Sequence, residues 1–152
     1  MPDKISVPTR SILAAIVLWA VEEVSEKTSG SGIIIPNEVA LSSMIVVLKR
    51  QHGLDTQDVS IRADIGEHAR ELSEKIGVPL GGWISDDLCS FLGHFELFGL
   101  AFRERESGKF EVHPKAIELC NEILEKDSEK GHAEDIRALR EALRTYKAIV
   151  RR

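Results

Sequence analysis

The chain has few of the side chains that mark specialised classes of protein. Its 152 residues include two cysteines, two methionines and one tyrosine, and aromatic residues make up 5% of it. Two cysteines are too few for a disulfide framework. Both Cys89 and Cys120 fall on the apolar face of a predicted helix, where a small thiol usually serves as packing. We therefore expect a reducing, cytoplasmic setting.

Long apolar runs are also missing. The longest, ILAAIVLWAV at residues 12–21, is about half of the roughly 20 residues that a bilayer-spanning helix needs. It continues directly into charged residues without a small-residue cleavage site. We interpret it as a buried helix and expect no membrane partner.

Positive charge is scarce as well. The formal net charge is −5, the wrong sign for a protein whose whole surface attracts phosphate. Residues 132–152 carry six basic and three acidic side chains, a net of +3, which leaves −8 for residues 1–131. Any contact with nucleic acid would have to be local.

No motif of an enzyme stands out. The five histidines lack a second pair of ligands at metal spacing, the sequence SGSGIIIP lacks a P-loop lysine, and there is no serine nucleophile elbow. Cys89 follows Asp86 and Asp87, which would raise its pKa and make it a poor nucleophile. The cluster that comes nearest to a set of metal ligands consists of Asp64, Glu67, His68 and Glu71. Such a pattern is also typical of a surface helix. We expect no catalytic residue, metal or cofactor.

The composition and the apolar periodicity of the chain predict a folded, mainly α-helical protein. Hydrophobic residues make up 43% and charged residues 30%, enough for one ordinary domain with a core. Apolar periodicity, capping residues and glycine stops predict helices over 9–27, 38–52, 67–76, 85–98, 114–126 and 134–150, a short strand over 33–35 and a hairpin over 100–112. The segment VSIR at 59–62 is a weaker strand candidate, and VPLGGW at 78–83 is expected to be a turn.

The stretch from Ser85 to Pro114 reads as a helix that runs into a β-hairpin. Ser85 is a predicted N-cap, and Gly99 ends the helix. Five apolar side chains are expected to face the core: Leu88, Phe91, Leu92, Phe95 and Phe98. The SGK turn at 107–109 joins the hairpin strands, and Pro114 begins the next helix.

With this order of elements, ARELSEKIGVP followed by ISDDLCSFLGHFELFGLAFRERESGKFEVHPKAIEL resembles the C-terminal portion of a winged-helix domain, over Ala69–Leu119. The resemblance implies that helix 85–98 is the recognition helix and that the hairpin is the wing. We expect a winged-helix-like domain over 1–131 and a basic C-terminal helical extension over 132–152. The first 65 residues then hold either the remaining helix and strand of that domain or a separate helical layer.

The predicted recognition helix departs from this family in its chemistry. Its outward face has no lysine or arginine. The residues on this face are Asp86, Asp87, Ser90, Gly93, His94 and Leu97. A helix that reads DNA needs donors for base edges and cations for phosphates. Trp83 stands where the family usually has a tight polar turn, and is either a lid on the core or an interface anchor. We therefore predict a protein interface at Trp83, His94 and Leu97.

Two groups of cations remain as candidates for contact with nucleic acid or an acidic partner: Arg103, Arg105 and Lys109 in the wing, and Arg137, Arg140, Arg144 and Lys147 along one side of the last helix. In the wing they alternate with glutamates, which is typical of a solvated hairpin. On the last helix they could equally pair with the acidic body of the same chain. Beside them runs a short heptad seam, suited to packing on the same chain or on a second copy: Ile136, Leu139, Leu143, Tyr146 and Val150.

The sequence thus favours a non-catalytic protein-interaction module, a small subunit of a multi-protein complex with a protein partner. The winged-helix resemblance supplies precedent, since such domains act as adaptors as well as repressors. The alternative is a homodimeric DNA-binding transcriptional regulator that contacts phosphates through the wing and the C-terminal arginines.

Overall fold

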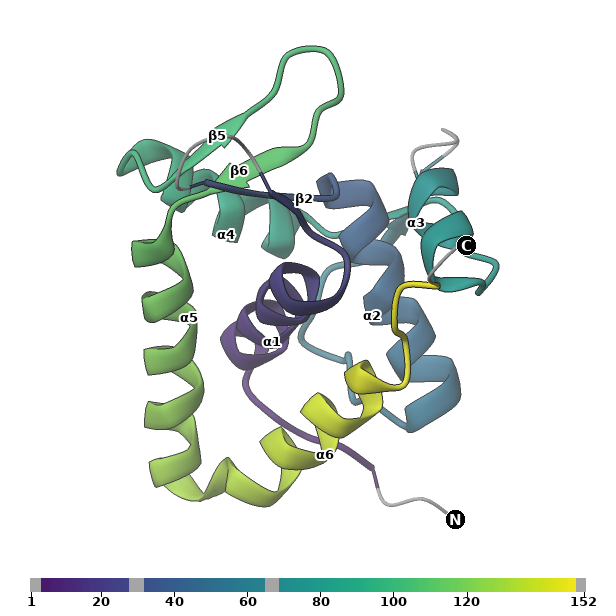
Figure 1. Ribbon diagram of the computed structural model, residues 1–152. Coiled ribbons are helices and arrows are strands. Elements are labelled where there is room, and N and C mark those ends of the chain that lie inside the picture. The colour runs from purple at the N-terminus through teal and green to yellow at the C-terminus, as the bar shows by residue number, and fades with distance from the viewer. Residues whose placement is uncertain (1–3, 28–31, 65–68, 150–152) are drawn as a thin grey trace.

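The computed structural model describes residues 4–27, 32–64 and 69–149. Helix α1 (Thr9–Glu23) runs through the middle of the molecule, with α5 (Pro114–Asp127) and α2 (Glu38–His52) on opposite sides and α6 (Ala133–Arg144) across one end (Figure 1). A small antiparallel sheet covers the other end. With 58% helix and small antiparallel sheets, the helix-rich architecture is confirmed.

Helix α1 is the centre of the core. Every residue from Ser11 to Ala20 is buried, which is the environment predicted for the apolar run at 12–21. The helix ends at Glu23 rather than at Lys27, because the chain turns there into the short strand β1 (Glu26–Lys27). Within the described ranges, no helix is long and apolar enough to cross a bilayer.

Local signals place several helix ends correctly. The Asn37 side chain accepts a hydrogen bond from the backbone N–H of Ala40 at 3.0 Å and so caps α2, which ends at Gly53 with φ 72°. The Ser85 hydroxyl caps α4 (Asp86–Leu97) by accepting from the Leu88 N–H at 3.2 Å. Pro114 is the first residue of α5, as predicted.

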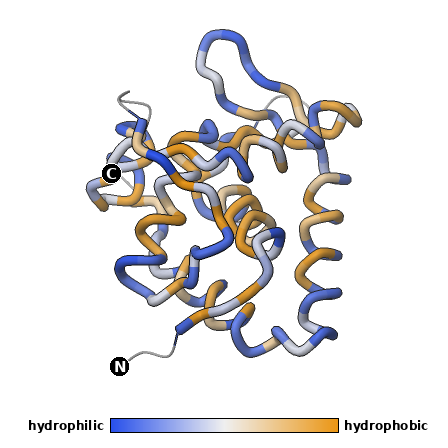
Figure 2. The backbone as a smooth tube through the Cα atoms, turned by 180° about the vertical axis from the view of Figure 1, so that it is seen from behind, coloured by the Kyte–Doolittle hydropathy of each residue, from blue (hydrophilic) through white to orange (hydrophobic). Residues whose placement is uncertain are grey.

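The sheet has the strand order β1-β2-β6-β5, all antiparallel, with β2 (Ile33–Ile35), β5 (Ala101–Arg103) and β6 (Phe110–Val112). The predicted hairpin is therefore confirmed as β5–β6, and Figure 2 shows that its tip is hydrophilic. A second, two-stranded sheet joins β3 (Arg62–Ala63) to β4 (Trp83–Ile84). The turn predicted over 78–83 thus ends one residue early, because Trp83 pairs with Ala63. Helix α3 (Arg70–Ile76) lies between these strands in sequence.

The connection between α5 and α6 is helical but irregular. An irregular helical turn over residues 128–132, with Gly131 at φ 99°, joins α5 to α6, where the sequence predicts a charged break. Helix α6 ends at Arg144, not near Val150, so the prediction of a longer final helix is wrong. Hydrogen bonds to other elements hold the segment that follows, among them those from the Trp19 indole N–H to the Tyr146 carbonyl at 2.9 Å and from the Ile149 N–H to the Lys75 carbonyl at 2.7 Å.

A buried carboxylate joins the end of α5 to the start of α1. Asp127, 1% exposed, accepts hydrogen bonds from the Ser11 hydroxyl at 2.6 Å and from Arg10 Nε at 3.0 Å, and it also forms an ion pair with Arg10 Nη2. These hydrogen bonds from Arg10 hold the pKa of Asp127 below its usual value of 3.8, although burial acts in the opposite direction. The carboxylate is therefore ionised at neutral pH.

Candidate functional site

Helix α4 presents to solvent four of the six residues that the sequence places on its outward face, whereas Asp87 and Gly93 are half-buried. Asp86, Ser90, His94 and Leu97 are exposed, while Leu88, Leu92 and Phe95 are buried and Phe91 is half-buried. Phe98 is the exception. It was predicted to face the core but is 72% exposed, because α4 ends at Leu97 and the chain leaves the helical path at the next residue.

Three large apolar side chains are exposed at the turn from α4 into β5. Leu97 is 77%, Phe98 72% and Phe102 57% exposed; we call these three residues the apolar patch. His94 lies one helical turn before Leu97 on the same side of α4. The patch is thus continuous along the chain with the exposed face of the predicted recognition helix.

The carboxylates at the start of α4 have structural partners. Asp87 accepts a hydrogen bond from the Ser60 N–H at 2.8 Å, and Asp86 lies 3.4 Å from the guanidinium of Arg62. Both contacts fasten the segment around β3 to the first turn of α4. The two acids therefore hold this helix in place and also make the surface of its first turn negatively charged.

Arg103 is held within the chain. Its guanidinium donates to Glu38 at 2.7 Å, lies 3.7 Å from Glu96 and sits 4.6 Å above the centroid of the Phe110 ring. The hydrogen bond to Glu38 is the main cause of its raised pKa. A phosphate would have to compete with two carboxylates for this side chain.

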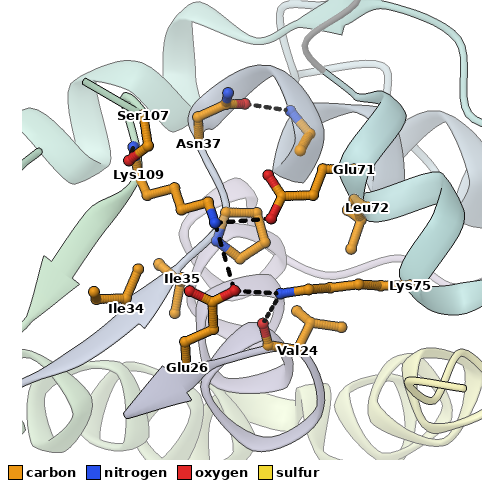
Figure 3. A pocket seen from close by; sticks show the side chains of 12 residues that line it. Val24, Glu26, Ile34, Ile35, Asn37, Glu71, Leu72, Lys75, Ser107 and Lys109 are labelled. Atoms are coloured by element: carbon orange, nitrogen blue, oxygen red, sulfur yellow. Dashed lines mark hydrogen bonds and ion pairs between the residues drawn. The ribbon is translucent and has the colours of Figure 1, made fainter. Parts of the chain in front are cut away.

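Lys109 is paired in a similar way, within the cluster shown in Figure 3. Its ammonium group lies 2.8 Å from Glu71 and 3.5 Å from Glu26, and Lys75 lies 3.3 Å from the same Glu26 oxygen. The hydrogen bond to Glu71 is the main cause of the raised pKa of Lys109. The cavity between these residues holds about 20 Å³, room for little more than one water molecule. The cluster therefore ties the hairpin to α3 and β1 and leaves no space for a ligand.

The cations of the C-terminal helix divide into two sets. Arg140 lies 3.4 Å from Glu22 of α1, so it pairs with the acidic body of the chain. Arg137, Arg144 and Lys147 are exposed, as is Arg105 in the wing. Within residues 4–27, 32–64 and 69–149, these four have no ion-pair partner.

The predicted heptad seam packs inside the chain. Ile136, Leu139 and Leu143 are buried in the core that α6 forms with α1. Tyr146 lies beyond the end of α6, where its hydroxyl is 2.7 Å from His52 Nε2. Val150 lies outside the described residues. These three side chains therefore already pack against residues of the same chain.

Trp83 lies apart from the other two predicted interface residues. It precedes α4, whereas Leu97 ends it, and 12 helical residues at about 1.5 Å each separate them. The half-buried indole instead faces α2, with the Arg50 guanidinium 5.4 Å from its ring centroid. The structure thus brings His94 and Leu97 together and places Trp83 elsewhere, beside α2.

The chemistry expected of a nucleophile or metal centre is not assembled in the described part of the chain. Burial, then the charges of Glu38 and Asp86, raise the pKa of the half-buried Cys89, and burial raises that of Cys120 to about 12. No group of three or more histidine, cysteine or acidic side chains among the described residues is placed to hold a metal ion. Glu67 and His68, half of the predicted cluster, lie outside these residues.

Compared with protein-family models, with curated proteins and with solved structures, the chain gives no match. Sequence reasoning missed Phe98 and Phe102 as surface residues. The alternation of the hairpin offered a signal for Phe102. It follows the buried Ala101 on β5, and successive side chains of a strand point to opposite faces.

Proposed function

We propose that the chain is a non-catalytic protein-interaction module with a winged-helix-like fold, acting as a subunit of a multi-protein assembly. The observation that carries this proposal is the exposed apolar patch of Leu97, Phe98 and Phe102 at the end of the predicted recognition helix. Single exposed apolar residues are ordinary, but several large ones exposed within one short stretch of chain, from Leu97 to Phe102, favour an interaction surface. The aromatic side chains are also of the type that anchors interfaces.

The arrangement around the sheet supports the winged-helix-like part of the proposal. Strand β2, which lies between α1 and α2 in sequence, pairs with β6 of the hairpin. This favours the interpretation in which the first 65 residues supply the remaining helix and strand of the domain. Helix α4 directly precedes the hairpin, as a recognition helix precedes its wing.

The charge around the patch indicates the chemistry of the partner. Glu104 and Glu106 are exposed on the hairpin that follows the patch, and residues 1–131 carry a net charge of −8. Arg103, the cation closest in sequence, is already paired with Glu38 and Glu96. The partner surface is therefore an apolar anchor flanked by basic side chains, because opposite charges around an interface favour the encounter.

Changing Phe98 to serine, alone or with Leu97 to serine, is expected to abolish capture of the partner from host extract and to weaken the purified complex about 30-fold or more. Truncating a central aromatic anchor costs about 2 kcal/mol. Ile149 to serine is the matched control, since Ile149 is 55% exposed on another part of the surface. Equal binding by all the variants would contradict the proposal.

The second candidate is the homodimeric DNA-binding regulator, favoured by one observation: Arg105, Arg137, Arg144 and Lys147 are exposed and unpaired in the described part of the chain. Against it, Arg103, Lys109 and Arg140 contact carboxylates of the same chain. A homodimer would also need a surface other than the buried side chains of the seam.

A titration with random-sequence and host genomic DNA separates the two candidates. We expect no saturable binding at about 50 mM or at about 200 mM salt, the range in which phosphate contacts are strongly weakened by counterions. Tight binding at the lower salt that is lost at the higher, and that disappears when Arg137 and Arg144 are changed to alanine, would favour the regulator. Replacing Glu134 with alanine is the control for altering the same helix.

A further inference from the structure

A groove of about 400 Å³ opens on the side of the molecule away from the α4–β5 turn. Val46 and Val47 of α2 form one wall, and Val78 and Pro79 after α3 form the other. Trp83 and Tyr146 also line it. Its volume falls within the range of about 300–1,000 Å³ that is typical of small-molecule sites.

Two polar side chains that line this groove, Ser43 and Tyr146, are already engaged. The Ser43 hydroxyl lies 2.6 Å from the Gly81 carbonyl, to which it donates, and the Tyr146 hydroxyl lies 2.7 Å from His52. Arg50 differs, because it is exposed and has no carboxylate partner among the described residues. The chain has a net charge of −5. Arg50 therefore stands out as a cation beside an apolar wall, with N–H groups available for hydrogen bonds.

The geometry of Arg50 favours a planar anion. Its guanidinium carbon lies 5.4 Å from the Trp83 ring centroid, within the range of a cation–π contact. The guanidinium still has N–H donors beside this contact, and these can form a fork with a carboxylate. The indole restricts the side chain, so less rotational freedom remains to be lost when an anion binds.

We propose that this groove binds a small carboxylate with a compact apolar body. The carboxylate pairs with Arg50, and the apolar body packs against Val47, Val78 and Trp83. This site is separate from the apolar patch and does not depend on the proposed protein partner. Its occupation would therefore be a second property of the chain.

Phenylpropionate and its uncharged amide are a suitable pair of probes, because they differ only in the group that would meet Arg50. Binding is followed by the indole N–H signal of Trp83, which lines the groove, in NMR spectra. We expect saturable binding of the acid at millimolar concentration, about tenfold tighter than that of the amide, as is typical of a charge-assisted hydrogen bond.

Two variants with the same change in charge test the assignment. Arg50→Gln is expected to bind acid and amide alike, whereas Lys49→Gln, a change at the exposed neighbour outside the groove, should keep the preference. No saturable binding by the wild-type protein, or a preference that survives in Arg50→Gln, would overturn the proposal. Tighter binding of a peptide ending in phenylalanine than of phenylpropionate would assign the groove to a peptide terminus instead of a small molecule.

Discussion

Replacing Asp127 with alanine is expected to lower the free energy of unfolding by about 3 kcal/mol, a value typical of breaking a buried ion pair whose other partner can be partly hydrated. The variant loses the hydrogen bonds from Arg10 and Ser11 that join α1 to α5. Ser11 is itself fully buried, so its hydroxyl would be left without this acceptor. Urea denaturation at neutral pH measures the effect, and Glu125→Ala, at an exposed site of the same helix, should change little.

The same carboxylate gives a pH dependence of defined sign. Because the pKa of Asp127 is lowered in the folded chain, its stabilisation is complete above the unfolded pKa of about 3.9 and is lost as the pH falls through the lower, folded pKa. The stability difference between wild type and Asp127→Asn should therefore be constant from about pH 7 to pH 5 and shrink below about pH 4. A difference that grows on acidification would show that the carboxylate is not ionised in the folded protein.

Leu139→Ala is expected to lower the free energy of unfolding by about 3 kcal/mol, as for other buried leucines that leave a cavity. Leu139 is fully buried where α6 packs on α1. Since this packing lies within one copy, the thermal midpoint of the wild type should not depend on protein concentration.

Arg137→Ala serves as the control for Leu139→Ala, because Arg137 lies on the exposed side of the same helix. A midpoint that rises with protein concentration would indicate that α6 packs against a second copy. So would a Leu139→Ala variant whose loss of stability disappears in concentrated solution.

The sequence predicts those features that depend on neighbours in the chain. Asn37 and Ser85 mark the starts of α2 and α4, and Gly53 marks the end of α2, because capping depends on the nature of one side chain and on nearby backbone groups. The hairpin is predictable for the same reason, since alternation and a glycine turn are local signals. The outward face of α4 follows from helical periodicity as far as the helix extends.

The ion pairs were beyond reach because their members lie far apart in sequence. Arg103 meets Glu38 across 65 residues, and Lys109 meets Glu71 across 38. Alternating charge on the hairpin looks like a solvated surface until the fold brings these partners to it. The end of α6 was missed because the heptad pattern continues through Tyr146 to Val150, whereas the chain leaves the helix after Arg144 and the Tyr146 hydroxyl lies against His52.

The position of α1 determines when the chain can finish folding during synthesis. This helix is highly enclosed and is made before α5 and α6, which cover it and begin only at Pro114 and Ala133. Until those residues leave the ribosome, the run at 12–21 has no permanent cover and remains a target for chaperones or for aggregation. Because most of the contacts of α1 join distant parts of the sequence, we expect slow folding for a helix-rich chain of this size.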